Sequence, residues 1–303
     1  MYDIIVIGGG PAGLTAALYA RRANKSALVI EKGSFGGQIT YSPKVENIPG
    51  FICVSGNEFA EKMVEQVLNQ GADIEIAEVS GIENGNIKTV HTDSGNFEAK
   101  AVIIATGAKH RPLGLDREQE FIGEGISFCA VCDGSFYENK TVAVIGGGNS
   151  ALQEALLLSD IAKKVYVIQN LDYFTGEEKL AEQLAARDNT EIIFGATVKE
   201  LLGETSLSGI KIAAKDGERK LIIDGMFIAI GLIPQNEPFY GVIALNGYGY
   251  ADSDETCTTE TDGIFAAGDC RSKKIRQVTT AVSDGTVAAL AACNYIDNAY
   301  KKP

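Results

Sequence analysis

The chain has 303 residues, with 27 basic and 40 acidic side chains and a formal net charge of −13. This negative charge argues against nucleic acid or an anionic membrane surface as a partner. No apolar run approaches the roughly 20 residues that a membrane span needs, and the N-terminus lacks a basic leader and apolar signal core, so we expect a cytoplasmic protein. The length exceeds that of a usual single core, which favours two domains.

The chain opens with an apolar strand, a glycine-rich turn and a helix over residues 14–24. The turn consists of Gly8, Gly9, Gly10, Pro11, Ala12 and Gly13. In such a unit the helix N-terminus receives a pyrophosphate, and glycines let the backbone approach it. A second apolar strand ends in Glu31, about 20 residues further on, where a ribose hydroxyl would be held. Because Glu31 would repel a 2′-phosphate, we expect FAD or NAD here rather than NADP.

The same pattern occurs a second time in the chain. An apolar strand over residues 141–145 leads into the turn Gly146–Ala151, a helix to about residue 162 and a strand over 164–168. The first copy closes with an apolar strand that runs into Thr106 and Gly107, and the second closes similarly over residues 225–231. This duplication predicts an α/β protein with two three-layer, Rossmann-like dinucleotide-binding domains.

Asp269 follows a further apolar strand near the C-terminus, before a last helix over about 278–298. A carboxylate at the carboxyl edge of a parallel sheet lies where ligands of such sheets bind, so we expect Asp269 to meet a cofactor hydroxyl. The alternative is that Asp269 caps the following turn.

Cys129 and Cys132 form a C-x-x-C motif followed by Asp133. Two intervening residues allow the sulfurs to close a small, reversible disulfide that can store and pass on two electrons. Structural zinc needs four ligands, and the chain has no second C-x-x-C and only two histidines, so we expect no metal. Two core cysteines are the other alternative, which the adjacent Asp133 disfavours. The remaining cysteines are expected to be ordinary buried thiols: Cys53, Cys257, Cys270 and Cys293.

With these motifs in place, the chain resembles the low-molecular-weight thioredoxin reductases over nearly its whole length. The matching segments are Gly8–Gly13, Gly36–Gln38, Val45–Gly50, Ala105–Gly107, Cys129–Gly134, Gly146–Ala151, Gly263–Asp269 and Arg276–Gln277. The resemblance implies a discontinuous FAD domain of residues 1–110 plus 240–303, with a domain of residues 111–239 inserted into it. It also implies a homodimer with thioredoxin as its protein substrate.

The resemblance also assigns roles to single residues. It implies that Cys132 lies against the flavin, that Cys129 attacks the substrate disulfide, and that Asp133 is the general acid. The cofactor-binding residues that it implies, together with the first glycine turn, are Glu31, Gly37, Gln38, Asn47, Thr106, Gly107, Asp269, Arg276 and Gln277.

The chain departs from the family after the second strand of the second copy. Where the family has a histidine and three arginines that hold the 2′-phosphate of NADPH, this chain has Gln169, Asn170, Leu171 and Thr175. Losing two or three charge-assisted hydrogen bonds, each worth about 1.5 to 3 kcal/mol, would weaken NADPH binding by roughly two orders of magnitude or more. The sequence is similar in this respect to the ferredoxin-dependent flavin thioredoxin reductases, so ferredoxin is the expected donor.

Other donors and other classes of function stay open. NADH could bind at the second glycine turn, with Gln169 or Asn170 at its ribose, although the acid that favours NADH is missing. Residual use of NADPH is a further alternative. A non-catalytic flavin module for redox sensing is disfavoured because such a module needs no exchangeable dithiol. A ferredoxin-to-NADP reductase is disfavoured because it needs the 2′-phosphate site.

An acidic donor such as ferredoxin would need a basic patch on this acidic protein. The candidates are Arg21, Arg22, Lys273 and Lys274, with solvated surface charge as the alternative.

Overall fold

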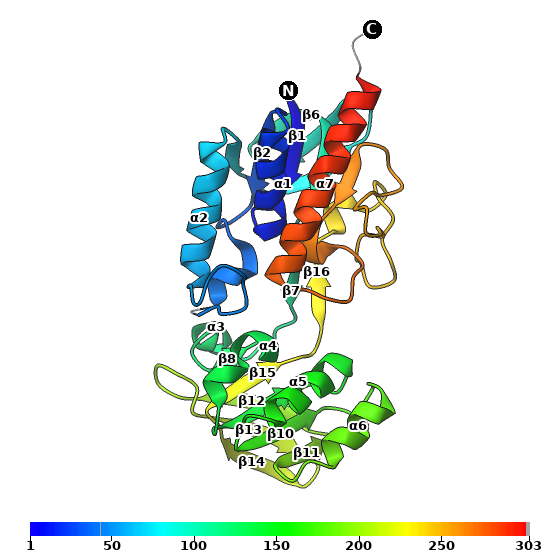
Figure 1. Ribbon diagram of the computed structural model, residues 1–303. Helices are drawn as coiled ribbons and strands as arrows, with labels where there is room; N and C mark the ends of the chain where they lie inside the picture. The colour runs from blue at the N-terminus through cyan, green and yellow to red at the C-terminus, as the bar shows by residue number, and fades with distance from the viewer. Residues whose placement is uncertain (43, 301–303) are drawn as a thin grey trace. The chain divides into compact units, whose positions relative to one another are not determined.

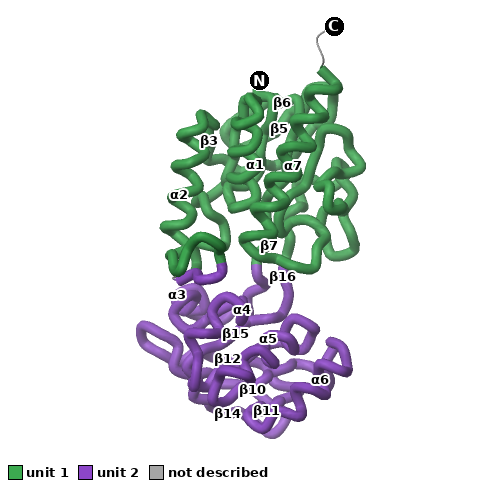
Figure 2. The backbone as a smooth tube through the Cα atoms, viewed as in Figure 1, with its two compact units in different colours: residues 1–43, 48–109, 233–303 green, residues 44–47, 110–232 purple. Residues whose placement is uncertain are grey.

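The computed structural model describes residues 1–42 and 44–300, and the chain divides into two compact units (Figures 1 and 2). Unit 1 consists of residues 1–43, 48–109 and 233–303, and unit 2 consists of residues 44–47 and 110–232. The chain leaves unit 1 and returns to it, so unit 2 is an insertion. The structure groups residues 44–47 with unit 2, whereas the division drawn from the sequence puts them with the FAD domain.

Unit 1 is built on a seven-stranded sheet. Its order is β3 (Asp73–Ile76), β2 (Ala27–Glu31), β1 (Tyr2–Ile7), β6 (Gly95–Ile104), β5 (Lys88–Thr92) and β4 (Val79–Glu83), with β17 (Ile264–Ala266) also paired to β6. Strands β3, β2, β1, β6 and β17 run parallel, and β5 and β4 are antiparallel. The helices are α1 (Pro11–Arg22), α2 (Gly56–Asn69) and α7 (Val278–Ala299), with short 3-10 turns η1 (Gly37–Tyr41), η3 (Glu237–Phe239) and η4 (Gly268–Cys270).

The alternation of side chains along β1 divides the core of unit 1 between the two faces of the sheet. Ile4 and Val6 lie in an apolar cluster with buried alanines of α1 and α7, whereas Ile5 and Ile7 lie in a second cluster with Val90 of β5. Helices α1 and α7 lie side by side over the first face (Figure 1). The glycine turn between β1 and α1 is therefore held by a core on both faces of its strand.

Unit 2 contains a second, all-parallel sheet. Its order is β11 (Thr190–Phe194), β10 (Lys164–Gln169), β9 (Thr141–Ile145), β15 (Gly225–Ile228) and β8 (Ile126–Ser127). The helical segments are α3 (Glu118–Phe121), α4 (Ala130–Asp133), η2 (Gly134–Tyr137), α5 (Asn149–Ser159) and α6 (Glu178–Ala185). Strands β12 (Thr197–Leu202), β13 (Gly209–Ala214) and β14 (Gly217–Ile222) form an antiparallel sheet. The short strands β7 (Ala108–His110) and β16 (Leu232–Pro234), which pair with one another, contain the two points at which the chain passes between the units.

The two glycine turns have the same local geometry, as the duplication in the sequence predicts. Gly8 has φ +110° and Gly146 has φ +132°, in the region that favours glycine. A Cβ at Gly8 would lie 2.4 Å from Ala105 O, and one at Gly146 would lie 2.5 Å from Ala229 O. In each copy the turn is thus pressed against the end of the closing strand, which confirms the predicted α/β fold of two Rossmann-like domains.

Some local predictions were wrong. The first helix begins at Pro11 rather than Leu14, because proline suits the first helical position. Cys53 is exposed, whereas Cys257, Cys270 and Cys293 are buried as expected. Within residues 1–42 and 44–300, no helix is long and apolar enough to cross a membrane.

Candidate functional site

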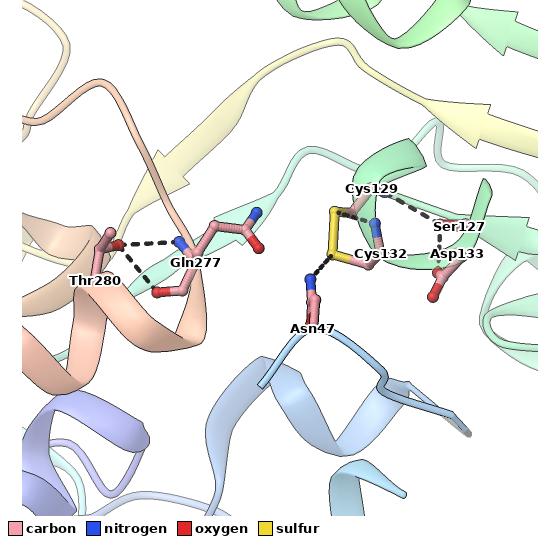
Figure 3. Close-up of a disulfide and its surroundings, with 7 residues drawn as sticks. All are labelled: Asn47, Ser127, Cys129, Cys132, Asp133, Gln277 and Thr280. Atoms are coloured by element: carbon pink, nitrogen blue, oxygen red, sulfur yellow. Dashed lines mark hydrogen bonds between the residues drawn. A yellow bond between two sulfur atoms is a disulfide. The ribbon is translucent and has the colours of Figure 1, made fainter. Parts of the chain in front are cut away.

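The C-x-x-C motif is a closed disulfide in unit 2. Cys129 and Cys132 are bonded to one another, with their Cα atoms 5.3 Å apart (Figure 3). Cys129 is the N-cap of the single-turn helix α4, and its Sγ accepts a 3.2 Å hydrogen bond from Cys132 N–H. The same N–H would stabilise a thiolate on Cys129 after reduction. Val131, between the two cysteines, is 65% exposed, so the motif lies at the surface of its unit.

Asp133 is fixed directly behind the disulfide. Its Oδ2 accepts a 2.6 Å hydrogen bond from the Ser127 hydroxyl group, which in turn accepts a 3.1 Å hydrogen bond from Cys129 N–H (Figure 3). The other oxygen, Oδ1, is buried without a partner. Burial raises the pKa of Asp133, and the bond from Ser127 opposes this in part. A carboxyl group that keeps its proton more readily is suited to act as an acid toward a sulfur.

Asn47 lies beside the dithiol. Its Nδ2 donates a 4.0 Å hydrogen bond to Cys132 Sγ (Figure 3). The resemblance assigns Asn47 to the flavin, and the structure places it in the short segment 44–47 that groups with unit 2. The amide is therefore a donor for a sulfur in this structure.

The first glycine turn and Glu31 form a candidate nucleotide site within unit 1. Glu31 Oε2 accepts a 2.7 Å hydrogen bond from Gly9 N–H, and Oε1 accepts one of 2.9 Å from Gly33 N–H. The end of β2 is thereby tied to the turn. A cavity of about 200 Å³ opens here, and its lining includes Gly8, Glu31 and Thr106. Carboxylate, glycine backbone and cavity together fit the adenosine and pyrophosphate half of a dinucleotide.

Asp269 is a second residue of unit 1 that is suited to contact a bound cofactor. Its Oδ1 is buried and has no partner, and burial raises the pKa of the carboxyl group. A buried carboxylate oxygen without a donor is costly, and a hydroxyl group of a bound ligand would supply that donor. The Arg276 guanidinium lies against this segment, donating a 3.4 Å hydrogen bond to Asp269 O. Gln277 is the N-cap of α7 and forms a capping box with Thr280.

The remaining predicted cofactor residues of unit 1 lie in turns at the carboxyl ends of strands or close to them. Gly37 has φ +62° and Gly107 has φ +70°. Gln38 Nε2 donates a 2.8 Å hydrogen bond to Ala108 O, and Thr106 Oγ1 donates one of 3.2 Å to Asn236 Oδ1. Gln38 therefore joins the η1 turn to the segment that follows β6.

The second glycine turn is occupied in part by residues of its own unit. Gln169, at the end of β10, is 4% exposed, and its amide nitrogen would lie 2.3 Å from a Cβ at Gly147. Its Nε2 donates a 3.2 Å hydrogen bond to Tyr173 O. Thr175 N–H donates to Gly147 O at 2.8 Å. Gln169 is thus turned inward, and the neighbouring cation Lys215 is paired with Asp172 at 2.6 Å.

Of the four candidate docking cations, Arg22 and Lys274 are exposed, whereas Lys273 and Arg21 are engaged within the protein. Lys273 Nζ donates a 2.9 Å hydrogen bond to Asp284, and its side chain is 8% exposed. The expectation that Lys273 could meet an acidic partner was therefore wrong. Arg21 is engaged with two backbone carbonyl groups, Gln70 O and Lys25 O.

Among the described residues, no group of three or more His, Cys, Asp or Glu side chains is placed to hold a metal ion.

Two residues near the dithiol were not predicted from the sequence. Ser127 carries the hydrogen bonds described above. Glu154 of α5 is a carboxyl group at a partly buried position, and its Oε2 has no partner. The signal for Glu154 was present, because an acid interrupts the apolar face of a helix there.

Comparison with known proteins agrees with this geometry. A family model described as pyridine nucleotide-disulphide oxidoreductase matches residues 2–285. A thioredoxin reductase of Listeria monocytogenes is 39% identical over 98% of this chain and 94% of its own length. A 34.2 kDa protein in the rubredoxin operon of Clostridium pasteurianum is 41% identical over 97% of each chain. The crystal structure of thioredoxin reductase from Streptococcus pyogenes has a TM-score of 0.93 and 40% identity, covering 98% of this chain and 99% of its own. The chain therefore belongs to the pyridine nucleotide-disulphide oxidoreductases, as an FAD-binding member of the thioredoxin reductase family.

Proposed function

We propose that the protein is a thioredoxin-disulfide reductase that acts in the cytoplasm as a homodimer. The observation that carries the proposal is the disulfide with an acid fixed behind it, in which Ser127 joins Asp133 to the backbone of Cys129. When bound, FAD supplies the two electrons that open this disulfide. The relatives named thioredoxin reductase support thioredoxin as the substrate.

The residues of the site divide the thiol chemistry between them. Reduction of the Cys129–Cys132 bond takes two electrons and two protons and gives two thiols. Cys129, as thiolate, attacks one sulfur of the thioredoxin disulfide and forms a mixed disulfide, while Asp133 gives a proton to the sulfur that leaves. Cys132 then attacks Cys129, which restores the disulfide of the enzyme and releases thioredoxin with two thiols. We assign Cys132 to the exchange with the flavin.

We further propose ferredoxin as the electron donor. Support comes from the end of β10, where Gln169 is folded onto the glycine turn and Asn170, Leu171 and Thr175 carry no charge. A ferredoxin cluster near about −400 mV and a thioredoxin dithiol near about −270 mV differ by about 130 mV, so transfer of two electrons releases roughly 6 kcal/mol. Ferredoxin can therefore drive the reaction without a hydride donor.

A nicotinamide nucleotide is the second candidate donor. The family description names pyridine nucleotides, and the turn Gly146–Ala151 retains its glycine geometry. NADH requires fewer contacts at this site than NADPH does, since it has no 2′-phosphate.

The test is anaerobic reduction of the flavin by NADPH, NADH and reduced ferredoxin in parallel, followed by turnover of thioredoxin with each donor. We expect rapid bleaching and turnover with ferredoxin and slow bleaching with both nucleotides. Bleaching by NADPH within milliseconds at micromolar concentration would show that the donor proposal is wrong. Absence of thioredoxin turnover with every donor would overturn the function itself.

A further inference from the structure

Asp284 is a buried acid on α7, and its carboxyl group is 6% exposed. The next residue, Gly285, is pressed against the start of α1, since a Cβ there would lie 2.2 Å from Ala12 O. Asp284 therefore lies where α7 meets the helix that begins at the first glycine turn. A charge buried at such a place is costly unless other groups compensate it.

Four hydrogen bonds compensate the carboxyl group of Asp284. Arg271 donates two of them, from Nε at 2.8 Å and from Nη2 at 2.9 Å, and Lys273 Nζ donates one of 2.9 Å. The fourth comes from the backbone, where Gly268 N–H donates to Oδ2 at 3.0 Å. Burial alone would raise the pKa of Asp284, but the hydrogen bonds from the two cations outweigh it, so the pKa is lowered. Asp284 is thus a carboxylate with both oxygens engaged.

The backbone bond links Asp284 to the turn that carries Asp269. Gly268 is the first residue of η4 and directly precedes Asp269. It has φ +79°, and a Cβ there would lie 2.8 Å from the Cβ of Ala12, so this turn is closely packed against the start of α1. The bond from Gly268 N–H to Asp284 therefore fixes the peptide that leads into Asp269, the residue suited to contact the cofactor.

The two cations that bind Asp284 follow Asp269 closely in the chain. Arg271 and Lys273 are the second and fourth residues after it, yet Asp269 Oδ1 is buried without a partner. A free cation this near would be expected to bind a carboxylate oxygen. Arg271 is instead held by Asp284 and by Asp254 O, to which its Nη1 donates at 3.0 Å. The carboxylate on α7 thus engages both cations and leaves Oδ1 of Asp269 open.

We propose that Asp284 is a positioning residue for FAD: it holds Gly268 and both cations so that Asp269 presents a free carboxylate oxygen to a hydroxyl group of the cofactor. Buried ion pairs can often be replaced by apolar residues of similar volume without loss of stability, so stability alone does not explain a buried cluster of three charges. The inference concerns the cofactor, and it depends neither on the electron donor nor on the thiol substrate.

Asp284→Asn tests this role, because the variant has nearly the same size but offers one acceptor oxygen in place of two. We expect FAD to bind about 10-fold or more weakly, as when one hydrogen bond to a charged acceptor is lost. The rise of flavin fluorescence on dilution of the holoenzyme measures the affinity. Asp297→Asn is the matched control, since it removes an exposed carboxylate of the same helix that is paired with Lys25, and it should keep the parental affinity.

A double-mutant cycle separates positioning from a general effect on the fold. If Asp284 acts through Asp269, then Asp284→Asn should weaken FAD binding by less than about 3-fold in the Asp269→Ala background, because the contact that it positions is already gone. An equal loss in both backgrounds would overturn the proposal, since Asp284 would then act on the cofactor by another route. Parental affinity in either single variant would overturn it as well.

A second variant addresses the same contact more gently. Arg271→Lys keeps the positive charge but lacks the planar fork that donates two hydrogen bonds to Asp284. It takes the place of Asp284→Asn in the cycle if that variant does not fold. We expect weaker FAD binding in the parent background and little further loss beside Asp269→Ala. Equal losses in the two backgrounds, or no loss in either, would contradict the role given to Asp284.

Discussion

The Ser127 hydroxyl group donates a 2.6 Å hydrogen bond to Asp133 Oδ2 and accepts one of 3.1 Å from Cys129 N–H. One buried side chain therefore connects the proposed acid to the backbone of the proposed nucleophile. Ser127 is the last residue of β8, which pairs with β15. The edge of the parallel sheet thus positions the serine that joins the acid to the backbone of Cys129.

Ser127→Ala should change the pH dependence of the enzyme. The hydrogen bond from Ser127 lowers the pKa of Asp133, so its removal raises that pKa and Asp133 keeps its proton to higher pH. The alkaline limb of the pH profile of kcat/KM for thioredoxin should therefore move to higher pH. Leaving Cys129 N–H without its acceptor should also cost about 1 to 3 kcal/mol of stability. Ser206→Ala, at an exposed site, is the control, and an unmoved limb in Ser127→Ala would contradict the role given to the hydroxyl group.

Asp133→Asn should lower turnover by about 100-fold or more, the usual size of a general-acid contribution. The amide oxygen can still accept from Ser127, so the fold and the FAD content should be unchanged. Steady-state reduction of thioredoxin and the flavin absorbance of the purified variant measure the two quantities. Asp216→Asn, on an exposed turn, should have parental activity. Parental turnover in Asp133→Asn would remove Asp133 from the mechanism.

The two cysteines should respond differently to substitution. Cys132→Ser should leave Cys129 free to trap thioredoxin as a stable mixed disulfide, since no second thiol can release it. Cys129→Ser should instead leave a thiolate at Cys132 that perturbs the flavin spectrum. Mass spectrometry of the trapped complex and absorbance spectra distinguish the two variants, and the reversed pattern would exchange the assigned roles.

The sequence allowed the fold to be predicted because the determining features are local. Gly8 and Gly146 are needed where φ is positive and a strand end approaches, and such turns can be recognised from a few adjacent residues. The packing of α5, which carries Glu154, against α4 is a tertiary contact that periodicity does not predict. Lys273 was misjudged for the same reason, since its partner Asp284 lies 11 residues away on α7. Cys53 shows that the tendency of cysteine to be buried is only statistical.

Asp269→Ala should weaken FAD binding. The carboxyl oxygen without a partner, Oδ1, is the acceptor expected for a cofactor hydroxyl. Losing a hydrogen bond to a charged acceptor costs about 1.5 to 3 kcal/mol, which corresponds to roughly 10- to 100-fold in affinity. Fluorescence titration of the apoprotein with FAD measures this change. Asp252→Ala removes an exposed carboxylate from the same unit and serves as the control. Equal affinity in the two variants would favour a capping role for Asp269.

Arginines introduced after β10 should create a site for NADPH. Asn170, Leu171 and Thr175 are exposed, so Asn170→Arg, Leu171→Arg and Thr175→Arg can be combined without disturbing the core. Each charge-assisted hydrogen bond to the 2′-phosphate contributes about 1.5 to 3 kcal/mol, so NADPH should bind at least about 100-fold more tightly.

The matched control replaces the same three residues with glutamine, which supplies length and hydrogen bonds without charge. The arginine variant should gain nothing with NADH, which lacks the 2′-phosphate, and its reduction by ferredoxin should be similar to that of the parent. Stopped-flow bleaching of the flavin over a range of nucleotide concentrations gives both affinities. If the parent already binds NADPH as tightly as the arginine variant, the exposed face of this loop is not where the 2′-phosphate is selected, and the loss of the family's arginines does not decide the donor.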